Sequence, residues 1–163
     1  MLHKSTIMLE TQRLNVVIHY RTLNKFIIIK GEKNMKARIK FLSIGNKKLK
    51  SEHVKNWNNL IERYAPDMYA IFNAVGEEEG IKQIVQLRPE IIMLSSKIKD
   101  VMGLLIKIKQ IHPTAAVFIM LGVVDDEQEA IDEFKAHGAY KCYTSPLSMD
   151  TLIHDMYVAL NME

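Results

Sequence analysis

The regular alternation of apolar strand patterns with amphipathic helix patterns restricts the fold of this chain more than any other feature. From residue 35 onward, short apolar runs alternate five times with segments whose apolar residues recur every three or four positions. The expected strands cover residues 35–45, 68–74, 90–95, 115–121 and 139–143. The expected helices begin at Ser51 and then cover residues 77–87, 100–111, 126–137 and 148–161. This order predicts parallel strands joined by helical crossovers.

The fold class that follows is α/β, a three-layer α/β/α arrangement with a five-stranded, doubly wound parallel sheet. Two helices show clear inward stripes: Val54, Trp57, Ile61 and Tyr64 in the first, and Leu104, Leu105, Ile108 and Ile111 in the third. The acid Asp100, just before the third helix, is expected to cap it.

Residues 1–34 are expected to form a basic N-terminal extension to a domain at residues 35–163. The extension carries six Lys and Arg against two Glu, a net charge of +4, whereas the remainder carries −1. The apolar segments 14–20 and 26–30 fit a hairpin, a helix followed by a strand, or a poorly ordered appendage. No apolar run is long enough for a membrane span and the start lacks a signal-peptide pattern, so a cytoplasmic protein is expected.

Cofactor and metal motifs are missing from the sequence. There is no GxxxxGK[ST], GxGxxG, GxSxG or HExxH string. The six histidines never lie three or four residues apart, and the single cysteine, Cys142, has no second thiol for a zinc site or a disulfide. We therefore expect no cofactor and no metal.

Four segments, taken in order, resemble a known family. Residues 74–103 read AVGEEEGIKQIVQLRPEIIMLSSKIKDVMG, and residues 125–138, 139–147 and 148–160 read DDEQEAIDEFKAHG, AYKCYTSPL and SMDTLIHDMYVAL. These segments resemble the receiver domains of two-component response regulators, with their "RPDLILLD" strand and "GADDYLTKPF" turn. The resemblance covers roughly residues 35–160 and implies the receiver strand order 2-1-3-4-5.

The same resemblance indicates that the phosphoryl-transfer residues are lost. The phospho-accepting Asp is replaced by Ser95, and a hydroxyl is a far weaker nucleophile than a carboxylate. The metal-binding acids after the first strand are replaced at Ile44 and Gly45, which offer no oxygen ligand to Mg²⁺. The switch hydroxyl falls near Gly122, and the family's Lys is Ser145. Two scaffold positions are retained, Gly103 and Pro146.

The resemblance therefore implies an atypical receiver, or pseudo-receiver, that is not an enzyme and signals by phosphorylation-independent protein interaction. The expected contact surface is the fourth helix, fifth strand and fifth helix, roughly residues 126–161, binding another protein or a second copy in a homodimer. Neither a membrane nor nucleic acid is expected as a partner. The alternative is a flavodoxin-like protein that binds a small ligand, flavin or nucleotide in the strand-edge crevice near residues 45–48, Ser95, Ser96 and Gly122.

Overall fold

The computed structural model describes residues 38–46, 59–66, 68–122, 127–144 and 146–161. The chain divides into two units, Met1–Lys36 and Ala37–Glu163, and every described residue lies in the second. The five strands of this unit are β1 (Ile39–Gly45), β2 (Tyr69–Val75), β3 (Ile91–Ser95), β4 (Ala116–Met120) and β5 (Lys141–Tyr143).

All five strands pair in parallel, in the order β2-β1-β3-β4-β5. In the centre of the sheet Ile44 of β1 lies opposite Leu94 of β3, and Ser95 of β3 lies opposite Met120 of β4. The predicted fold class and the predicted strand order are confirmed. Because the strands are parallel, their carboxyl ends meet at one edge of the sheet.

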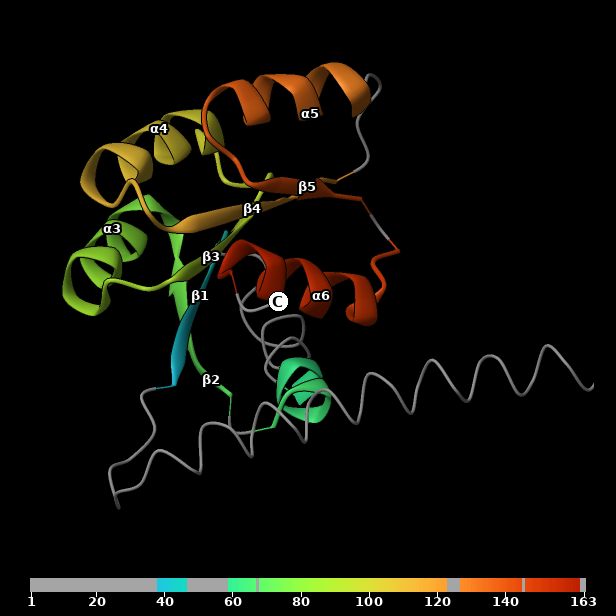
Figure 1. The fold of residues 1–163 in the computed structure, drawn as a ribbon. Coiled ribbons are helices and arrows are strands. Elements are labelled where there is room, and N and C mark those ends of the chain that lie inside the picture. The colour runs from blue at the N-terminus through green and yellow to red at the C-terminus, as the bar shows by residue number, and fades with distance from the viewer. Residues whose placement is uncertain (1–37, 47–58, 67, 123–126, 145, 162–163) are drawn as a thin grey trace, which may run out of the picture. The chain divides into compact units, whose positions relative to one another are not determined.

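Helices cover both faces of this sheet. The labelled helices are α3 (Gly76–Leu87), α4 (Val101–Ile111), α5 (Glu127–Ala136) and α6 (Met149–Ala159), and residues 59–64 are also helical. Figure 1 shows α3, α4 and α5 on one side of the sheet, with α6 and residues 59–64 on the other. The domain thus has three layers, α/β/α.

The hydrophobic core lies on both faces because side chains alternate along each strand. Leu42, Ile92 and Leu94 pack in one cluster with buried residues of α3, α4 and α5. Their neighbours Phe41 and Met93 point to the other face and are also buried. Central strands that are buried on both sides explain why their sequences are almost continuously apolar.

Two helix starts show how local sequence sets the element boundaries. The Asp100 side chain accepts a hydrogen bond from the Gly103 backbone N–H at 2.9 Å, which confirms the predicted cap of α4. The hydroxyl of Ser148 accepts from the Thr151 N–H at 3.5 Å at the start of α6. A polar side chain thus satisfies an otherwise unpaired amide in each first turn.

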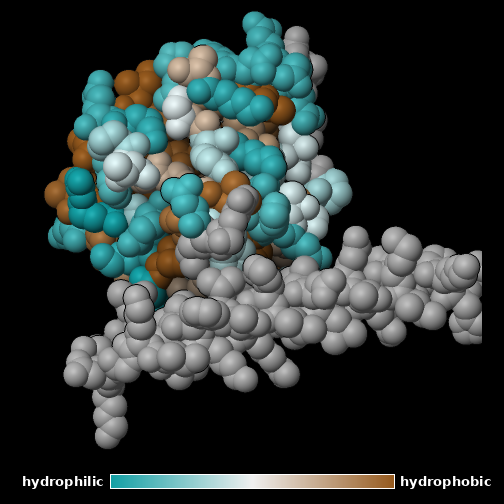
Figure 2. All heavy atoms as spheres, viewed as in Figure 1, coloured by the Kyte–Doolittle hydropathy of each residue, from teal (hydrophilic) through white to brown (hydrophobic). Residues whose placement is uncertain are grey.

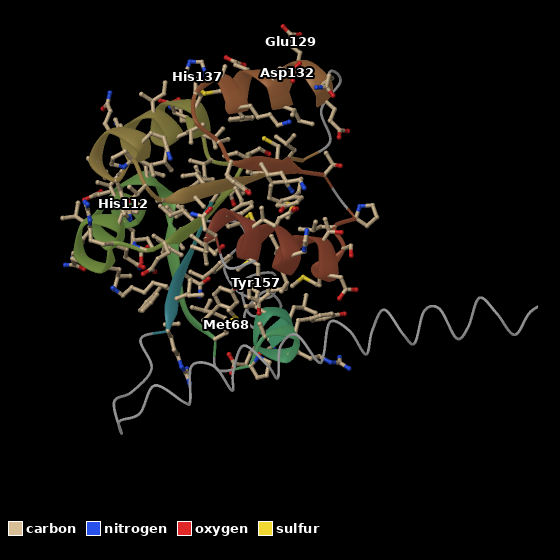
Figure 3. The ribbon with its side chains drawn as sticks, in the orientation of Figure 1. Met68, His112, Glu129, Asp132, His137 and Tyr157 are labelled. Carbon is tan, nitrogen blue, oxygen red and sulfur yellow. The ribbon has the colours of Figure 1, made fainter. Side chains whose placement is uncertain are left out.

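Polar contacts also join elements that are far apart in the sequence. The Tyr157 hydroxyl on α6 donates to the Met68 sulfur at 2.9 Å, just before β2, and Figure 3 shows the two side chains side by side. His112, at the end of α4, is buried, with Nε2 2.9 Å from the Pro89 carbonyl oxygen. This histidine therefore serves a structural role at a helix end.

One prediction of an inward-facing residue is wrong. Tyr64 was expected in the apolar stripe of the first helix, but 42% of it is exposed, whereas Ile61 and Ala65 are fully buried. Ile61 and Ala65, four residues apart, form the buried line, so Tyr64 lies at its edge, where a tyrosine can keep its polar end in water. Val54, Trp57 and the extension at residues 1–34 lie outside the described residues.

Candidate functional site

The residues predicted to replace the receiver chemistry come from three neighbouring strands. Gly45 ends β1, Ser95 ends β3, and Gly122 follows β4 after Leu121. The parallel sheet brings these strand ends to one edge. Pro146 is exposed after β5, and Ser145 lies outside the described residues.

Ile44 does not line this edge. Its side chain is 1% exposed and packs under α3, where a Cβ atom on Gly80 would lie only 2.8 Å from Ile44 Cδ1. Beyond it, Gly45 and Asn46 complete the described end of β1, and neither bears a carboxylate. The lysines that follow Asn46 in sequence lie outside the described residues, so the predicted crevice is described only in part.

The Ser95 hydroxyl is used within its own turn. Its Oγ accepts a hydrogen bond from the Lys97 N–H at 3.3 Å, and its carbonyl accepts from the Ile98 N–H at 3.2 Å. Ile98 is buried in the core cluster. The turn after β3 is therefore anchored by an apolar side chain and by the serine itself.

Ser96 makes the contact that connects two strand ends. Its N–H donates to the Met120 carbonyl at 2.9 Å, and its Oγ accepts from the Gly122 N–H at 2.9 Å. Ser96 was expected in the crevice, but it was given no role of its own. The sequence does show a second hydroxyl directly after the end of β3. Its partner, the Gly122 amide, is identified only by the fold, which places the ends of β3 and β4 side by side.

The carboxylate nearest in sequence to this turn is already engaged. Asp100 accepts from Gly103, and a Cβ on Gly103 would lie 2.3 Å from Asp100 Oδ2. The retained glycine thus makes room for the capping carboxylate. Beside these residues lies a hollow of about 240 Å³ lined by Asn46, Gly76, Glu77, Ile98, Lys99 and Asp100.

The part of the chain that the structure describes contains no group of three or more His, Cys, Asp or Glu side chains arranged to hold a metal ion. Nor does it contain a helix with the length and apolar character needed to cross a bilayer.

The predicted contact surface corresponds to α5, β5 and α6. Its outer part carries exposed acids on α5, among them Glu129 and Asp132, which point away from the sheet in Figure 3. Figure 2 shows mainly hydrophilic side chains over this helix. Just before β5, Tyr140 is 42% exposed and its ring meets the ring of Phe118 edge to face, with centroids 5.2 Å apart. Exposed tyrosines are enriched at protein interfaces, and acids such as those on α5 are typical of an interface rim rather than of its core.

Beneath this surface, a buried carboxylate joins α6 to β5. Asp155 Oδ2 accepts hydrogen bonds from the Tyr143 hydroxyl and from Lys141 Nζ, both at 2.7 Å. The Tyr143 ring stacks on Phe118 with centroids 5.9 Å apart. Burial, and secondarily the hydrogen bond to Asp155, raise the pKa of Tyr143 above its ordinary value of 10.0. We call these three residues, Lys141, Tyr143 and Asp155, the α6 clasp.

The comparisons with known proteins agree with the topology. No protein-family model and no curated protein matches the chain. Solved structures do match it. One is a two-component response regulator from Clostridium difficile, 21% identical, with a TM-score of 0.62, over 76% of this chain and 97% of that one.

Two further solved structures give the same result. A response regulator receiver domain from Clostridium thermocellum is 21% identical, with a TM-score of 0.64, over 76% of this chain and 94% of that one. The signal receiver domain of a DNA-binding response regulator from Colwellia psychrerythraea 34H is 21% identical, with a TM-score of 0.63, over 77% and 99%. The second unit of this chain therefore has the fold of response regulator receiver domains.

Proposed function

We propose that this protein is a pseudo-receiver, a signalling module that binds a partner protein without being phosphorylated. The observation that carries the proposal is the side chain found at the end of β3. Where the receiver resemblance places an acceptor carboxylate, the chain has Ser95, whose hydroxyl is held by the Lys97 amide.

The surroundings of Ser95 support the same conclusion. No described residue at the end of β1 offers a carboxylate to Mg²⁺, and the neighbouring carboxylate of Asp100 caps α4. Phosphoryl transfer depends on positioning and on neutralising charge by metal ions and cations. Without these groups a weak nucleophile such as a serine hydroxyl gains no activation.

The surface formed by α5, β5 and α6 is the proposed contact surface. Its exposed Tyr140 and the charged residues on α5 can contact a partner, while the α6 clasp keeps the layer below in place. The partner, or a second copy of this chain in a homodimer, would bind this surface in the absence of phosphate.

The first experiment tests the absence of phosphoryl chemistry. The full chain is incubated with Mg²⁺ and acetyl phosphate, or with beryllofluoride, and its intact mass and thermal melt are recorded. We expect no phosphoryl adduct and no change in melting temperature, both for the natural chain and for Ser95→Asp, which restores only the nucleophile. A phosphoryl adduct on the natural chain, or stabilisation by several degrees, contradicts the proposal.

The second experiment tests the surface. Tagged natural chain, the variant Glu133→Arg on α5, and the matched control Glu78→Arg on α3, which makes the same change in net charge, are used to capture proteins from the native cell. Both positions are exposed, so the three proteins should melt alike. We expect the α5 variant alone to lose a partner that the other two retain. Flavin absorbance in the purified protein would instead favour ligand binding in the crevice.

A further inference from the structure

Three cations lie in a row along the edge of the sheet opposite to the candidate site, where the strands begin and the helices end. Lys40 Nζ, at the start of β1, donates to the Leu87 carbonyl at the end of α3 at 2.8 Å. Arg88 Nη1, on the next residue, donates to the Ile111 carbonyl at the end of α4, also at 2.8 Å. Lys109 Nζ donates to two carbonyls of the loop before β4, at 2.7 and 2.9 Å. We call Lys40, Arg88 and Lys109 the basic row.

Each cation of the basic row has hydrogen-bond donors left for a ligand. An ammonium group has three N–H donors and a guanidinium group has five. The bonds above use one donor of Lys40, one of Arg88 and two of Lys109. All of these bonds go to carbonyls, and within the described residues no ion pair joins the row to a carboxylate. The neighbouring acid, Glu90, accepts instead from the backbone N–H of Lys40 at 2.8 Å.

The fold separates charges that the composition leaves nearly balanced. Residues 35–163 carry a net charge of −1, a value that does not predict an anionic partner. The first turns of α3 and α5, at the opposite edge from the basic row, carry the acids Glu77, Glu78, Glu79, Glu127 and Glu129. Figure 3 marks the edge of the row by His112 and His137, which follow α4 and α5. The Lys109 stem is fixed there, because a Cβ on Gly138 would lie only 3.2 Å from Lys109 Cγ.

An exposed aromatic residue lies near the same edge. Tyr64, 42% exposed, ends the helix that precedes β2. The carbonyl of the next residue, Ala65, accepts from the Met68 N–H at 3.3 Å, and the Met68 carbonyl accepts from the Ile39 N–H at 3.0 Å. These bonds tie the end of that helix to the start of β1, one residue before Lys40. We infer that the basic row binds the phosphate backbone of a single-stranded nucleic acid, with Tyr64 stacking on a base.

A single strand fits this edge better than a lipid surface does. The large apolar side chains that the described residues expose are Leu60, Tyr64, Val85, Ile106 and Tyr140, and none lies in the loops of the row, residues 87–90 and 111–115. A membrane surface takes up apolar side chains beside the cations, whereas a phosphate backbone needs donors and a base needs an aromatic ring. The inference goes beyond the proposed function, because it involves neither phosphoryl transfer nor the α5, β5 and α6 surface.

Fluorescence anisotropy of the full chain with a short labelled oligodeoxythymidylate tests the basic row. Each phosphate contact to a single strand contributes about 0.7 to the slope of log affinity against log salt concentration, so Arg88→Gln/Lys109→Gln should be shallower by about 1.4. The matched control Lys97→Gln/Lys99→Gln removes the same charge from two exposed lysines at the other edge and should keep the natural slope. Arg88→Gln alone should lose about 0.7, which keeps the test valid if the double variant does not fold.

Base stacking has a separate readout. Tyr64→Ala should weaken binding of the single strand about fivefold or more, with the salt slope unchanged. Tyr64→Phe keeps the ring and should bind like the natural chain. Binding to a duplex, whose bases are already stacked on one another, should be the same in Tyr64→Ala and the natural chain.

A natural salt slope in the row variants, or an equal loss in the lysine control, overturns the inference and assigns any binding to other cations, such as those of residues 1–34. Natural affinity of Tyr64→Ala for the single strand overturns the stacking role. Binding of phosphatidylserine vesicles without binding of the oligonucleotide overturns the inference in favour of a membrane surface. Adduct formation and partner capture, which judge the proposed function, involve none of these residues, so the two can fail separately.

Discussion

Removing the Asp155 carboxylate should destabilise the domain more than removing any exposed acid of α6. Its side chain is 13% exposed, and one of its oxygens accepts from both Tyr143 and Lys141. Asp155→Ala leaves the Tyr143 hydroxyl, on a residue only 6% exposed, without its acceptor. The loss of such a charge-assisted hydrogen bond costs about 1.5–3 kcal/mol.

Two smaller effects also change the free energy of unfolding of Asp155→Ala. The side chain of Lys141 is 41% exposed, so its pairing with Asp155 is weakened by solvent and contributes roughly 0.5 kcal/mol. Alanine is the better helix former and returns roughly 0.5 kcal/mol. These two effects cancel, so we expect Asp155→Ala to lower the free energy of unfolding by about 1.5–3 kcal/mol, mainly through the lost tyrosine bond.

Urea unfolding followed by circular dichroism measures this loss. The control is His154→Ala, an exposed neighbour on the same helix, which should change stability by less than about 0.5 kcal/mol. Tyr143→Phe should cost about 1 kcal/mol, and combining it with Asp155→Ala should cost less than the two separate losses together. Equal stability of Asp155→Ala and the natural chain, or strict additivity with Tyr143→Phe, would refute the shared hydrogen bond.

Two further outcomes follow from burial. Because burial raises the pKa of Tyr143, the folded state holds the phenol proton more tightly; stability is full below pH 10.0 and falls above it, by up to about 1.4 kcal/mol per pH unit. Urea unfolding at several alkaline pH values should show this slope in the natural chain and a smaller one in Tyr143→Phe. Gly80→Val should cost about 1–3 kcal/mol by clashing with Ile44, which is 1% exposed. Ile44→Ala by itself should also destabilise, so the clash is tested by the double variant, which should lose less stability than the sum of the two single losses; strict additivity would refute the clash.

The layered fold could be predicted because its signals are local. The run at residues 90–95 is apolar and follows Arg88-Pro89, so it could be recognised as a buried strand without any knowledge of its neighbours. The cap at Asp100 likewise lies beside the helix that it starts. Tyr64 was wrongly placed because a spacing of three residues after Ile61 does not show which edge of the apolar stripe the sheet covers.

The α6 clasp was missed for a different reason. Asp155 was not singled out from the sequence, since acids are mostly exposed. The spacing did carry a signal, because Asp155 lies between Leu152 and Met156, both of which are fully buried. An acid on the inward stripe of a helix needs a buried partner, but only the sheet order reveals that the partner is on β5.

The bond between Ser96 and Gly122 bears on how such a protein could transmit a signal. A ligand shifts an equilibrium only by the difference between its affinities for the two states. At this strand edge the amides of Lys97 and Gly122 already donate to the hydroxyls of Ser95 and Ser96, so an incoming anion could accept from these amides only by displacing bonds that the fold has made. That competition reduces the affinity difference available to a small ligand. Under the proposed function, we expect regulation to act through the abundance of the partner that binds the α5, β5 and α6 surface, or through competition for it.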